Sequence, residues 1–343
     1  MPKPVDEQVV VMIGASSGIG RASALEFARR GAKVVCAARG VRALDTLVEE
    51  ITAAGGDAVA VPTDVADPAA VRALAARAEE RYGRVDTWVN CAAVAIWGKV
   101  EDITDAEFDR VTRVNYLGHV HGVHAVLPAL RRAGGGVIIG VSSVEGVRAV
   151  PLHGPYTASK WALRGFYDTL RMELAMDGEP IGVTTILPGP IDTPFFEHAR
   201  SKVGALPKPV PPVYAPELVA DAIVRASQHP TREVPVGDAA VSFFAGQRFS
   251  PALTDAVLSF RRVGAEAQKN DLPDNGVDNV DAAIDEPGQV HGTHATRVMR
   301  HSPLTTLLGR APRPGDLLTG ALAGLRRARG LPALVREVPA RPA

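Results

Sequence analysis

Short apolar runs alternate with amphipathic segments over the first 190 residues of the chain. The runs cover residues 9–13, 33–38, 58–62, 85–90, 136–143 and 182–187, and they have the length and the β-branched content of buried strands. The segments between them follow the helical period and predict helices over residues 18–30, 41–54, 68–82, 105–132 and 156–176. This alternation predicts an α/β fold, in which a doubly wound parallel sheet carries helices on both faces.

The alternation weakens beyond residue 190. Residues 205–216 are rich in proline and predict a loop, whereas 216–228 predict a helix, 234–236 a short strand and 239–263 one or two helices. Residues 268–288 combine Asp, Asn, Pro and Gly, which is typical of an extended arm. We therefore assign residues 1–263 to one domain and 264–343 to an irregular C-terminal extension, with a short helix at about 316–328.

The 38 basic and 38 acidic residues balance, so the chain has no overall attraction to nucleic acid. The extension is polarised, however, because residues 265–289 hold seven acids and one lysine, whereas 297–343 hold nine arginines and two acids. In this basic tail Leu318, Leu322 and Leu325 share a face. The tail could contact a membrane surface, cover a cavity, contact another subunit or be disordered. All four alternatives remain open, and membrane contact is the one that we favour least.

No apolar run approaches the roughly 20 residues that span a bilayer, and the first residues do not resemble a secretory signal. Cys36 and Cys91 end or follow apolar runs, which predicts buried thiols. Their strands would flank the first strand, and two strand spacings of roughly 10 Å are too far for a disulfide. These features predict a soluble, cytoplasmic protein.

A glycine-rich loop lies between the first predicted strand and the first predicted helix. Glycines there tighten the turn and let the main chain approach a diphosphate, which the free N–H groups and the dipole of the following helix attract. This context predicts a Rossmann-type dinucleotide site, and the alternative is a tight turn that binds no ligand. The loop residues that we assign to the dinucleotide are Gly14, Ser16, Ser17, Gly18, Ile19 and Gly20.

The end of the second strand reads Ala37-Ala38-Arg39. Many NAD sites place a carboxylate here for the ribose 2′-hydroxyl, and this chain has none. Arg39 instead suits a 2′-phosphate, which a guanidinium binds with two hydrogen bonds. We therefore predict NADP(H) as the cofactor. Two alternatives remain: Arg39 is a solvated surface charge, or Arg42 binds the 2′-phosphate in its place.

Tyr156 and Lys160 are four residues apart in a predicted helix, so their side chains share a face. Reduction of a carbonyl needs a hydride on carbon, which a nicotinamide supplies, and a proton on oxygen. The ordinary pKa of tyrosine, near 10, is high for this work, and we expect the Lys160 ammonium to lower it. Ser143, at the end of a predicted strand, suits a hydrogen bond to the substrate oxygen.

Together these motifs resemble the short-chain dehydrogenase/reductase family over about residues 8–250. The resemblance rests on Gly14-Ala-Ser-Ser-Gly18-Ile-Gly20, Asp64-Val65, Asn90-Cys-Ala-Ala93, Asn115, Ser143, Tyr156-x-x-x-Lys160 and Pro188-Gly189. It implies a catalytic set of Asn115, Ser143, Tyr156 and Lys160.

The resemblance also implies how these residues act. Tyr156 is the acid/base beside the cofactor, Lys160 also holds the nicotinamide ribose, and Asn115 anchors a water that relays protons. The other cofactor residues implied in this way are Asp64, Val65, Asn90, Pro188, Gly189 and Thr193. A homodimer or homotetramer is implied, formed through the helices that bear Asn115 and Tyr156.

The substrate of such a fold binds beyond the C-terminal ends of the strands. The residues that we expect around it are Trp97, Val150, His153, Phe195 and Phe196, with Val94, Ile96 and Val144 nearby. These side chains are mostly apolar and predict a hydrophobic ketone or secondary alcohol, although some of them are alternatively core residues. We expect Arg148 at the surface.

Two groups of histidines lack the ligand spacing of a metal site, so we predict no metal. His119, His121 and His124 follow Asn115, and we expect them at the surface or an interface. His291, His294 and His301 belong to the arm region.

The sequence thus predicts an NADP-dependent oxidoreductase with a small-molecule substrate and no nucleic-acid partner. Two alternatives remain open. One is a sensor or scaffold that binds NADP without turnover. The other is an NAD-dependent alcohol dehydrogenase.

Overall fold

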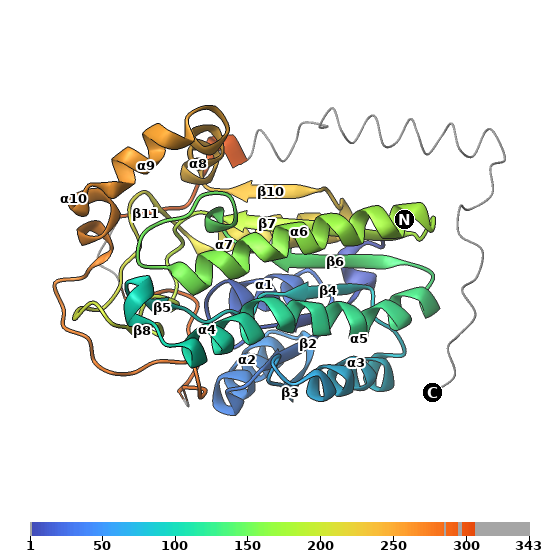
Figure 1. The fold of residues 1–343 in the computed structure, drawn as a ribbon. Helices are drawn as coiled ribbons and strands as arrows, with labels where there is room; N and C mark the ends of the chain where they lie inside the picture. The colour runs from blue at the N-terminus through green and yellow to red at the C-terminus, as the bar shows by residue number, and fades with distance from the viewer. Residues whose placement is uncertain (1, 285, 294–296, 306–343) are drawn as a thin grey trace.

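A seven-stranded sheet with all strands parallel forms the centre of the molecule (Figure 1). The computed structural model describes residues 2–284, 286–293 and 297–305. The strand order is β10-β7-β6-β4-β1-β2-β3, which reverses between β1 and β4, the doubly wound arrangement. The strands are β1 (Val9–Ile13), β2 (Lys33–Ala38), β3 (Asp57–Pro62), β4 (Thr87–Asn90), β6 (Gly136–Val141), β7 (Ile181–Pro188) and β10 (Glu233–Val236).

Helices cover both faces of the sheet. On one face, apolar residues of α1 (Gly18–Arg29), α2 (Val41–Ala53) and α7 (Pro216–Gln228) pack against the strands. On the other face the packing residues come from α3 (Pro68–Tyr82), α4 (Asp105–Thr112), α5 (Gly118–Arg132) and α6 (Gly154–Met176). Because both faces are buried, every residue of β1 is apolar and buried, and the strand reads as an unbroken apolar run.

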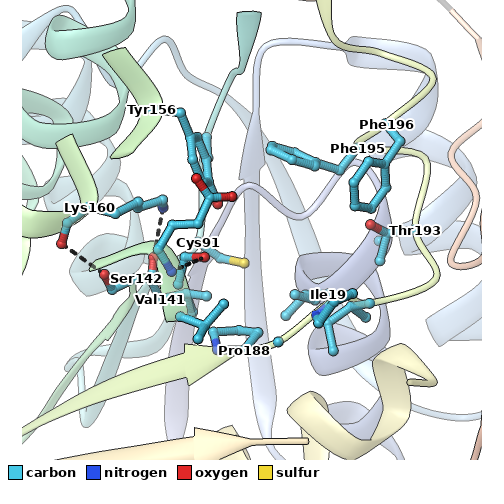
Figure 2. A pocket seen from close by; sticks show the side chains of 18 of the residues that line it. Ile19, Cys91, Val141, Ser142, Tyr156, Lys160, Pro188, Thr193, Phe195 and Phe196 are labelled. Carbon is cyan, nitrogen blue, oxygen red and sulfur yellow. Dashed lines mark hydrogen bonds between the residues drawn. The ribbon is translucent and has the colours of Figure 1, made fainter. Parts of the chain in front are cut away.

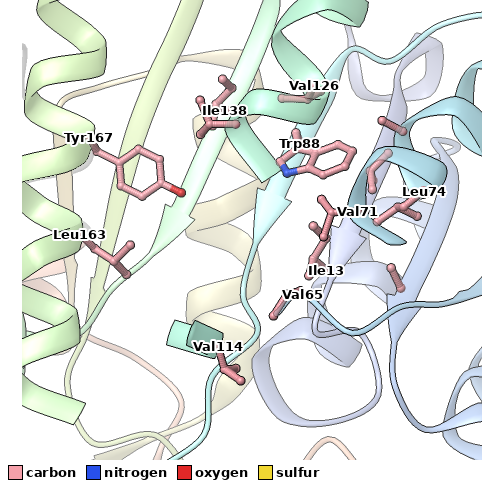
Figure 3. Close-up of a cluster of buried hydrophobic side chains, with 14 of the residues drawn as sticks. Ile13, Val65, Val71, Leu74, Trp88, Val114, Val126, Ile138, Leu163 and Tyr167 are labelled. Carbon is pink, nitrogen blue, oxygen red and sulfur yellow. The ribbon is translucent and has the colours of Figure 1, made fainter. Parts of the chain in front are cut away.

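A polar network is buried within the second of these layers. Figure 3 shows the apolar side chains of this layer, with Trp88 and Tyr167 among them. Trp88 Nε1 donates to Asn90 Oδ1 at 3.0 Å, and Asn90 Nδ2 donates to the Tyr167 hydroxyl at 3.0 Å. The same hydroxyl lies 2.8 Å from Nδ1 of His119. These bonds join polar side chains of β4, α5 and α6 inside an apolar layer and fix α5 and α6 on β4.

The sequence predicted the fold class, and the predicted bounds of β1, β2, α3 and α7 are those of the structure. The predicted helix over 105–132 has an interruption, because Arg113–Leu117 form a π-helical segment between α4 and α5. Such segments often accompany functional residues. Asn115 lies in this one.

The chain beyond β10 builds the region past the C-terminal ends of the strands (Figure 1). It forms α8 (Asp238–Phe249), α9 (Pro251–Ser259) and α10 (Arg261–Gly264), where one or two helices were predicted. A short strand of the arm, β11 (Val298–Met299), pairs with β9 (Val213–Tyr214), which interrupts the predicted proline-rich loop.

Cys36 and Cys91 are both free, as predicted. Cys36 is buried as expected, whereas Cys91 is only partly buried because it lines the cavity described below. Within the described residues, no helix is both long enough and apolar enough to cross a membrane. The predicted helix at about 316–328 and the predicted face of Leu318, Leu322 and Leu325 lie outside the described residues.

Candidate active site

The loops that follow the strands line a cavity of about 620 Å³ at the C-terminal edge of the sheet. This volume suits a cofactor or a small molecule, whose sites measure about 300–1,000 Å³. Most residues predicted for the cofactor and the reaction line it: Gly14, Ser16, Ser17, Gly18, Ile19, Gly20, Arg39, Asp64, Val65, Ser143, Tyr156, Lys160, Pro188, Gly189 and Thr193. The predicted substrate residues Val150, His153, Phe195 and Phe196 line it as well.

The glycines of the loop after β1 allow approaches that a side chain would block. Gly14 has a φ of +81°, and a Cβ added there would lie 2.7 Å from the main-chain nitrogen of Ala92. A Cβ on Gly20 would lie 2.0 Å from the carbonyl oxygen of Gly14, and one on Gly18 would lie 3.0 Å from Cβ of Thr193. The loop therefore brings bare main chain and the N-terminus of α1 to the cavity, which fits a diphosphate group.

Tyr156 and Lys160 meet at the opposite wall, on one face of α6 (Figure 2). Lys160 Nζ lies 5.3 Å from the centre of the Tyr156 ring and donates to the carbonyl oxygen of Val141 at 3.0 Å. Ser143 Oγ accepts from the main-chain N–H of Glu145 at 3.0 Å. A hydroxyl holds two lone pairs and one hydrogen, so Ser143 keeps its capacity to donate.

Burial raises the pKa of Tyr156, the Glu145 carboxylate adds to this rise, and a hydrogen bond with Ser143 partly opposes it. The predicted net fall of this pKa is therefore not found among the groups that the chain itself supplies, where the net shift is upward. Burial instead lowers the pKa of Lys160 from its ordinary 10.5 to about 8. The ammonium donates to Val141 O, and burial is the largest influence on the pKa of the phenol.

Asn115 is fully buried and lies behind the cavity wall. Its Oδ1 accepts from Val94 N at 2.8 Å, and its Nδ2 donates to Val94 O at 2.9 Å and to Ser159 Oγ at 3.2 Å. The amide thus joins the loop after β4 to α6. Both hydrogens of Nδ2 are used in this way, and the residue holds Tyr156 and Lys160 in place through their own helix.

Two further predicted residues lie behind the cavity wall. The side chain of Asn90 faces the buried network with Trp88 and Tyr167. Trp97 is 1% exposed and packs its ring 4.0 Å from that of His153, centre to centre. Both residues support the cavity from behind.

Glu145, Gln268 and Asn279 line the cavity and were missed in the sequence. Glu145 accepts from Nδ1 of His153 and from Oγ1 of Thr157, both at 2.8 Å. Its position two residues after Ser143 was an available signal. Gln268, which accepts from Trp97 Nε1 at 3.2 Å, and Asn279 come from the arm, where the sequence carried no such signal.

Two surface predictions are wrong. Arg148 is 7% exposed, because it pairs with Asp255 of α9 and donates to Gln247 of α8 at 2.9 Å. His119 is 2% exposed and belongs to the network of Tyr167. Among the described residues, no group of three His, Cys, Asp or Glu side chains is placed to hold a metal ion.

Arg39 lines the cavity, but its guanidinium also contacts the arm. It donates to the main-chain carbonyl oxygens of Asn279, Val280 and Asp281. Its charge is therefore held between the cavity and the arm and is not a solvated surface charge. The predicted adenine contact Asp64 lies nearby and pairs with Arg110 at 3.2 Å.

Comparison with known sequences agrees with this geometry. The family model described as short chain dehydrogenase matches residues 8–204. A protein of Bacillus subtilis named uncharacterized oxidoreductase YxnA is 38% identical over 275 residues, which cover 80% of this chain and 77% of that protein.

Two solved structures share the fold. A short-chain dehydrogenase/reductase from Burkholderia phymatum in complex with NAD has a TM-score of 0.67 and 27% identity, covering 74% of this chain and 96% of that one. An alcohol dehydrogenase from the archaeon Thermococcus sibiricus, complexed with 5-hydroxy-NADP, has a TM-score of 0.59 and 27% identity, covering 67% of this chain and 95% of that one.

The depressed pKa of Lys160 makes a prediction about stability. Its folded-state pKa of about 8 lies below the ordinary 10.5, so the unfolded chain holds more protons between these pH values. The contribution of Lys160 to the free energy of unfolding therefore rises with pH across this interval. We expect Lys160→Met to be more stable than the wild type at pH 7, and this advantage to shrink by up to about 3 kcal/mol by pH 10.5.

Urea unfolding of both proteins at pH 7 and pH 10 measures this change. The thiols of Cys36 and Cys91, whose pKa values are raised to about 12, are present in both proteins and largely cancel in the comparison. The same stability difference at the two pH values would contradict the assignment.

Proposed function

The chain belongs to the short-chain dehydrogenase family, and from this premise we propose that it is an NADP-dependent oxidoreductase. It transfers hydride between NADP(H) and a ketone or secondary alcohol. The observation that carries this proposal is the meeting of Tyr156, Ser143 and Lys160 at one wall of a cavity whose other wall is the glycine loop.

In the reductive direction the Tyr156 hydroxyl gives its proton to the substrate oxygen. The bound nicotinamide supplies the hydride. Ser143 donates a hydrogen bond to the same oxygen as negative charge develops on it. The phenol is protonated at neutral pH, as a general acid must be, whereas its raised pKa opposes release of the proton.

Lys160 has two further hydrogens besides the one given to Val141. We propose that they bind the nicotinamide ribose and help to return a proton to Tyr156. Asn115 acts as a positioning residue, since its amide joins Val94 to Ser159. Pro188, Gly189 and Thr193 would frame the nicotinamide end of the cofactor.

The adenosine end of the cofactor would lie between the glycine loop and the end of β2. Arg39 would bind the 2′-phosphate there, and Asp64 and Val65 would lie against the adenine. The charge of Arg39 at this end of the cavity favours NADP(H) over NAD. The solved relatives include complexes with both kinds of nucleotide.

The substrate end of the cavity is mainly apolar. Phe195 and Phe196 pack with their ring centres 5.4 Å apart, and Phe195 lies 5.4 Å from the ring of Tyr156. Leu258 of α9 lines the same cavity. A hydrophobic ketone or alcohol gains most from burial among such groups.

We also propose a cytoplasmic homodimer or homotetramer. On α6, Trp161, Met172 and Met176 are 43%, 60% and 53% exposed. Their spacing of eleven and four residues places them on one side of the helix, where another subunit would bury them.

A Tyr156→Phe variant tests the reaction. It removes the proton donor and leaves the ring in place, so we expect NADPH oxidation with hydrophobic ketones to fall about a hundredfold or more. NADPH should still raise the melting temperature. Tyr82→Phe, which removes a phenol outside the cavity lining, is the matched control. Unchanged turnover in Tyr156→Phe would disprove the mechanism, and a wild type that is stabilised by NADPH but reduces no ketone favours the sensor alternative.

An Arg39→Asp variant tests the cofactor. We expect the ratio of NADPH to NADH affinity to fall by roughly tenfold or more, or about 1.4 kcal/mol, as measured by titration of each nucleotide. The ratio is used because loss of the arm contact affects both nucleotides. Arg42→Asp is the control, and a fall in the ratio there instead would assign the phosphate to Arg42.

A Met172→Glu variant tests the assembly. A carboxylate at the centre of the exposed face of α6 should lower the mass measured by light scattering after size-exclusion chromatography, because burying an unpaired charge is costly. Leu272→Glu, at a 58% exposed position of the arm, should leave the mass unchanged. A Met172→Glu protein with the wild-type mass would place the interface elsewhere.

A further inference from the structure

The arm turns back from α10 across the cofactor end of the cavity. Asn279 N donates to the carbonyl oxygen of His198 at 2.9 Å, and Gly18 N donates to the carbonyl oxygen of Gln289 at 2.8 Å. Between these points a Cβ on Gly40 would lie 3.4 Å from Ile284 O. Residues 278–284 and 286–293 thus run past the end of β2 to the glycine loop.

The contact with the glycine loop is close. A Cβ added to Gly288 would lie 2.1 Å from the carbonyl oxygen of Ser16 and 2.7 Å from Nη1 of Arg21. Beyond it, Nδ1 of His291 lies 3.3 Å from Oδ2 of Asp192 in the loop after β7. The arm therefore packs against the loop assigned to the diphosphate and connects it to the loop after β7.

The arm is anchored at its start. Arg200 Nε pairs with Asp278 Oδ2 at 2.9 Å, and its Nη2 pairs with Asp281 Oδ2 at 2.7 Å. Val280 between them is fully buried, and its carbonyl oxygen accepts from Arg110 Nε at 2.8 Å. A buried apolar side chain flanked by two ion pairs holds this segment more firmly than a solvated loop.

The arm borders the cavity through Asn279. Asn279 lines the same cavity as Arg39 and Asp64, and Ile19 and Gly20 line it farther along. Arg39 contacts three carbonyl groups of the arm while it lines the cavity. The assigned 2′-phosphate site and the arm therefore share a residue.

We propose that residues 278–284 and 286–293 form the outer wall of the dinucleotide site, so that a bound dinucleotide leaves only after this wall detaches. This inference rests on the proposed function in that a dinucleotide must bind. It adds that the release rate is set by the anchor at Arg200, 78 and 81 residues away along the chain from Asp278 and Asp281.

A different arrangement would make the arm a competitor of the dinucleotide. Gln289 O occupies the N–H of Gly18, a group that a diphosphate also seeks. A competing arm lowers affinity without retaining the ligand, whereas a wall slows both entry and exit. The two therefore differ in the kinetics of binding.

The experiment compares the wild type with Asp278→Asn/Asp281→Asn, which keeps the shape of both side chains and removes their charges. NADPH bound to each protein is displaced by excess NADP⁺ in a stopped-flow instrument, and its fluorescence reports dissociation. We expect dissociation to be roughly tenfold faster in the double variant. Association should be faster as well, because a wall slows both entry and exit.

Asp274→Asn is the matched control, because Asp274 lies in the same arm and caps the N–H of Gly276, a bond that Asn also forms. It should dissociate at the wild-type rate. Melting without nucleotide checks that all three proteins are folded. An unchanged dissociation rate in the double variant overturns the inference. If NADPH also binds this variant more tightly while its dissociation rate is unchanged, the arm is a competitor of the dinucleotide.

Hydrogen exchange gives a second readout that does not depend on turnover. NADPH should slow exchange in residues 278–284 of the wild type and of Asp274→Asn, and should do so much less in the double variant. A wild type in which no nucleotide changes the melting temperature would instead reject the proposed function itself, and the inference with it.

Discussion

Parallel strands cannot be joined by tight turns, and the rest of this structure depends on that constraint. Each strand must be followed by a crossover before the next one begins in the same direction. Every strand of the central sheet therefore ends at the same edge, and the loops after β1, β6 and β7 meet there. Gly14, Ser143 and Pro188 are far apart in the sequence, yet they line one cavity for this reason.

Some of the residues around that cavity line it, and others hold the lining residues in place. Tyr156 and Lys160 are buried residues of α6. Burial disfavours the charged form of each group, so it raises the pKa of the tyrosine and lowers that of the lysine. Asn115, Trp97 and Asn90 do not line the cavity. They hold the loops and rings that do, through hydrogen bonds and ring packing.

The sequence predicted what depends on local pattern. The bounds of β1 and β2 could be predicted from their apolar runs, and those of α3 from its helical period. The glycine loop and the spacing from Ser143 to Tyr156 correctly indicated residues that line one cavity. It did not predict what depends on distant partners. Arg148 looked like a surface charge because Asp255 is 107 residues away. Asn279 and Gln268 looked like parts of an irregular arm because nothing nearby in the sequence shows where that arm packs.

The arm also has a consequence for the order in which the molecule is assembled during synthesis. Arg39 meets Asn279 across 240 residues of chain, so that contact closes a very long loop and forms late in folding. A chain that emerges from its N-terminus has produced the whole central sheet before residue 279 appears. The nascent sheet thus has an open nucleotide groove, which receives its last side only when the C-terminal part of the protein arrives.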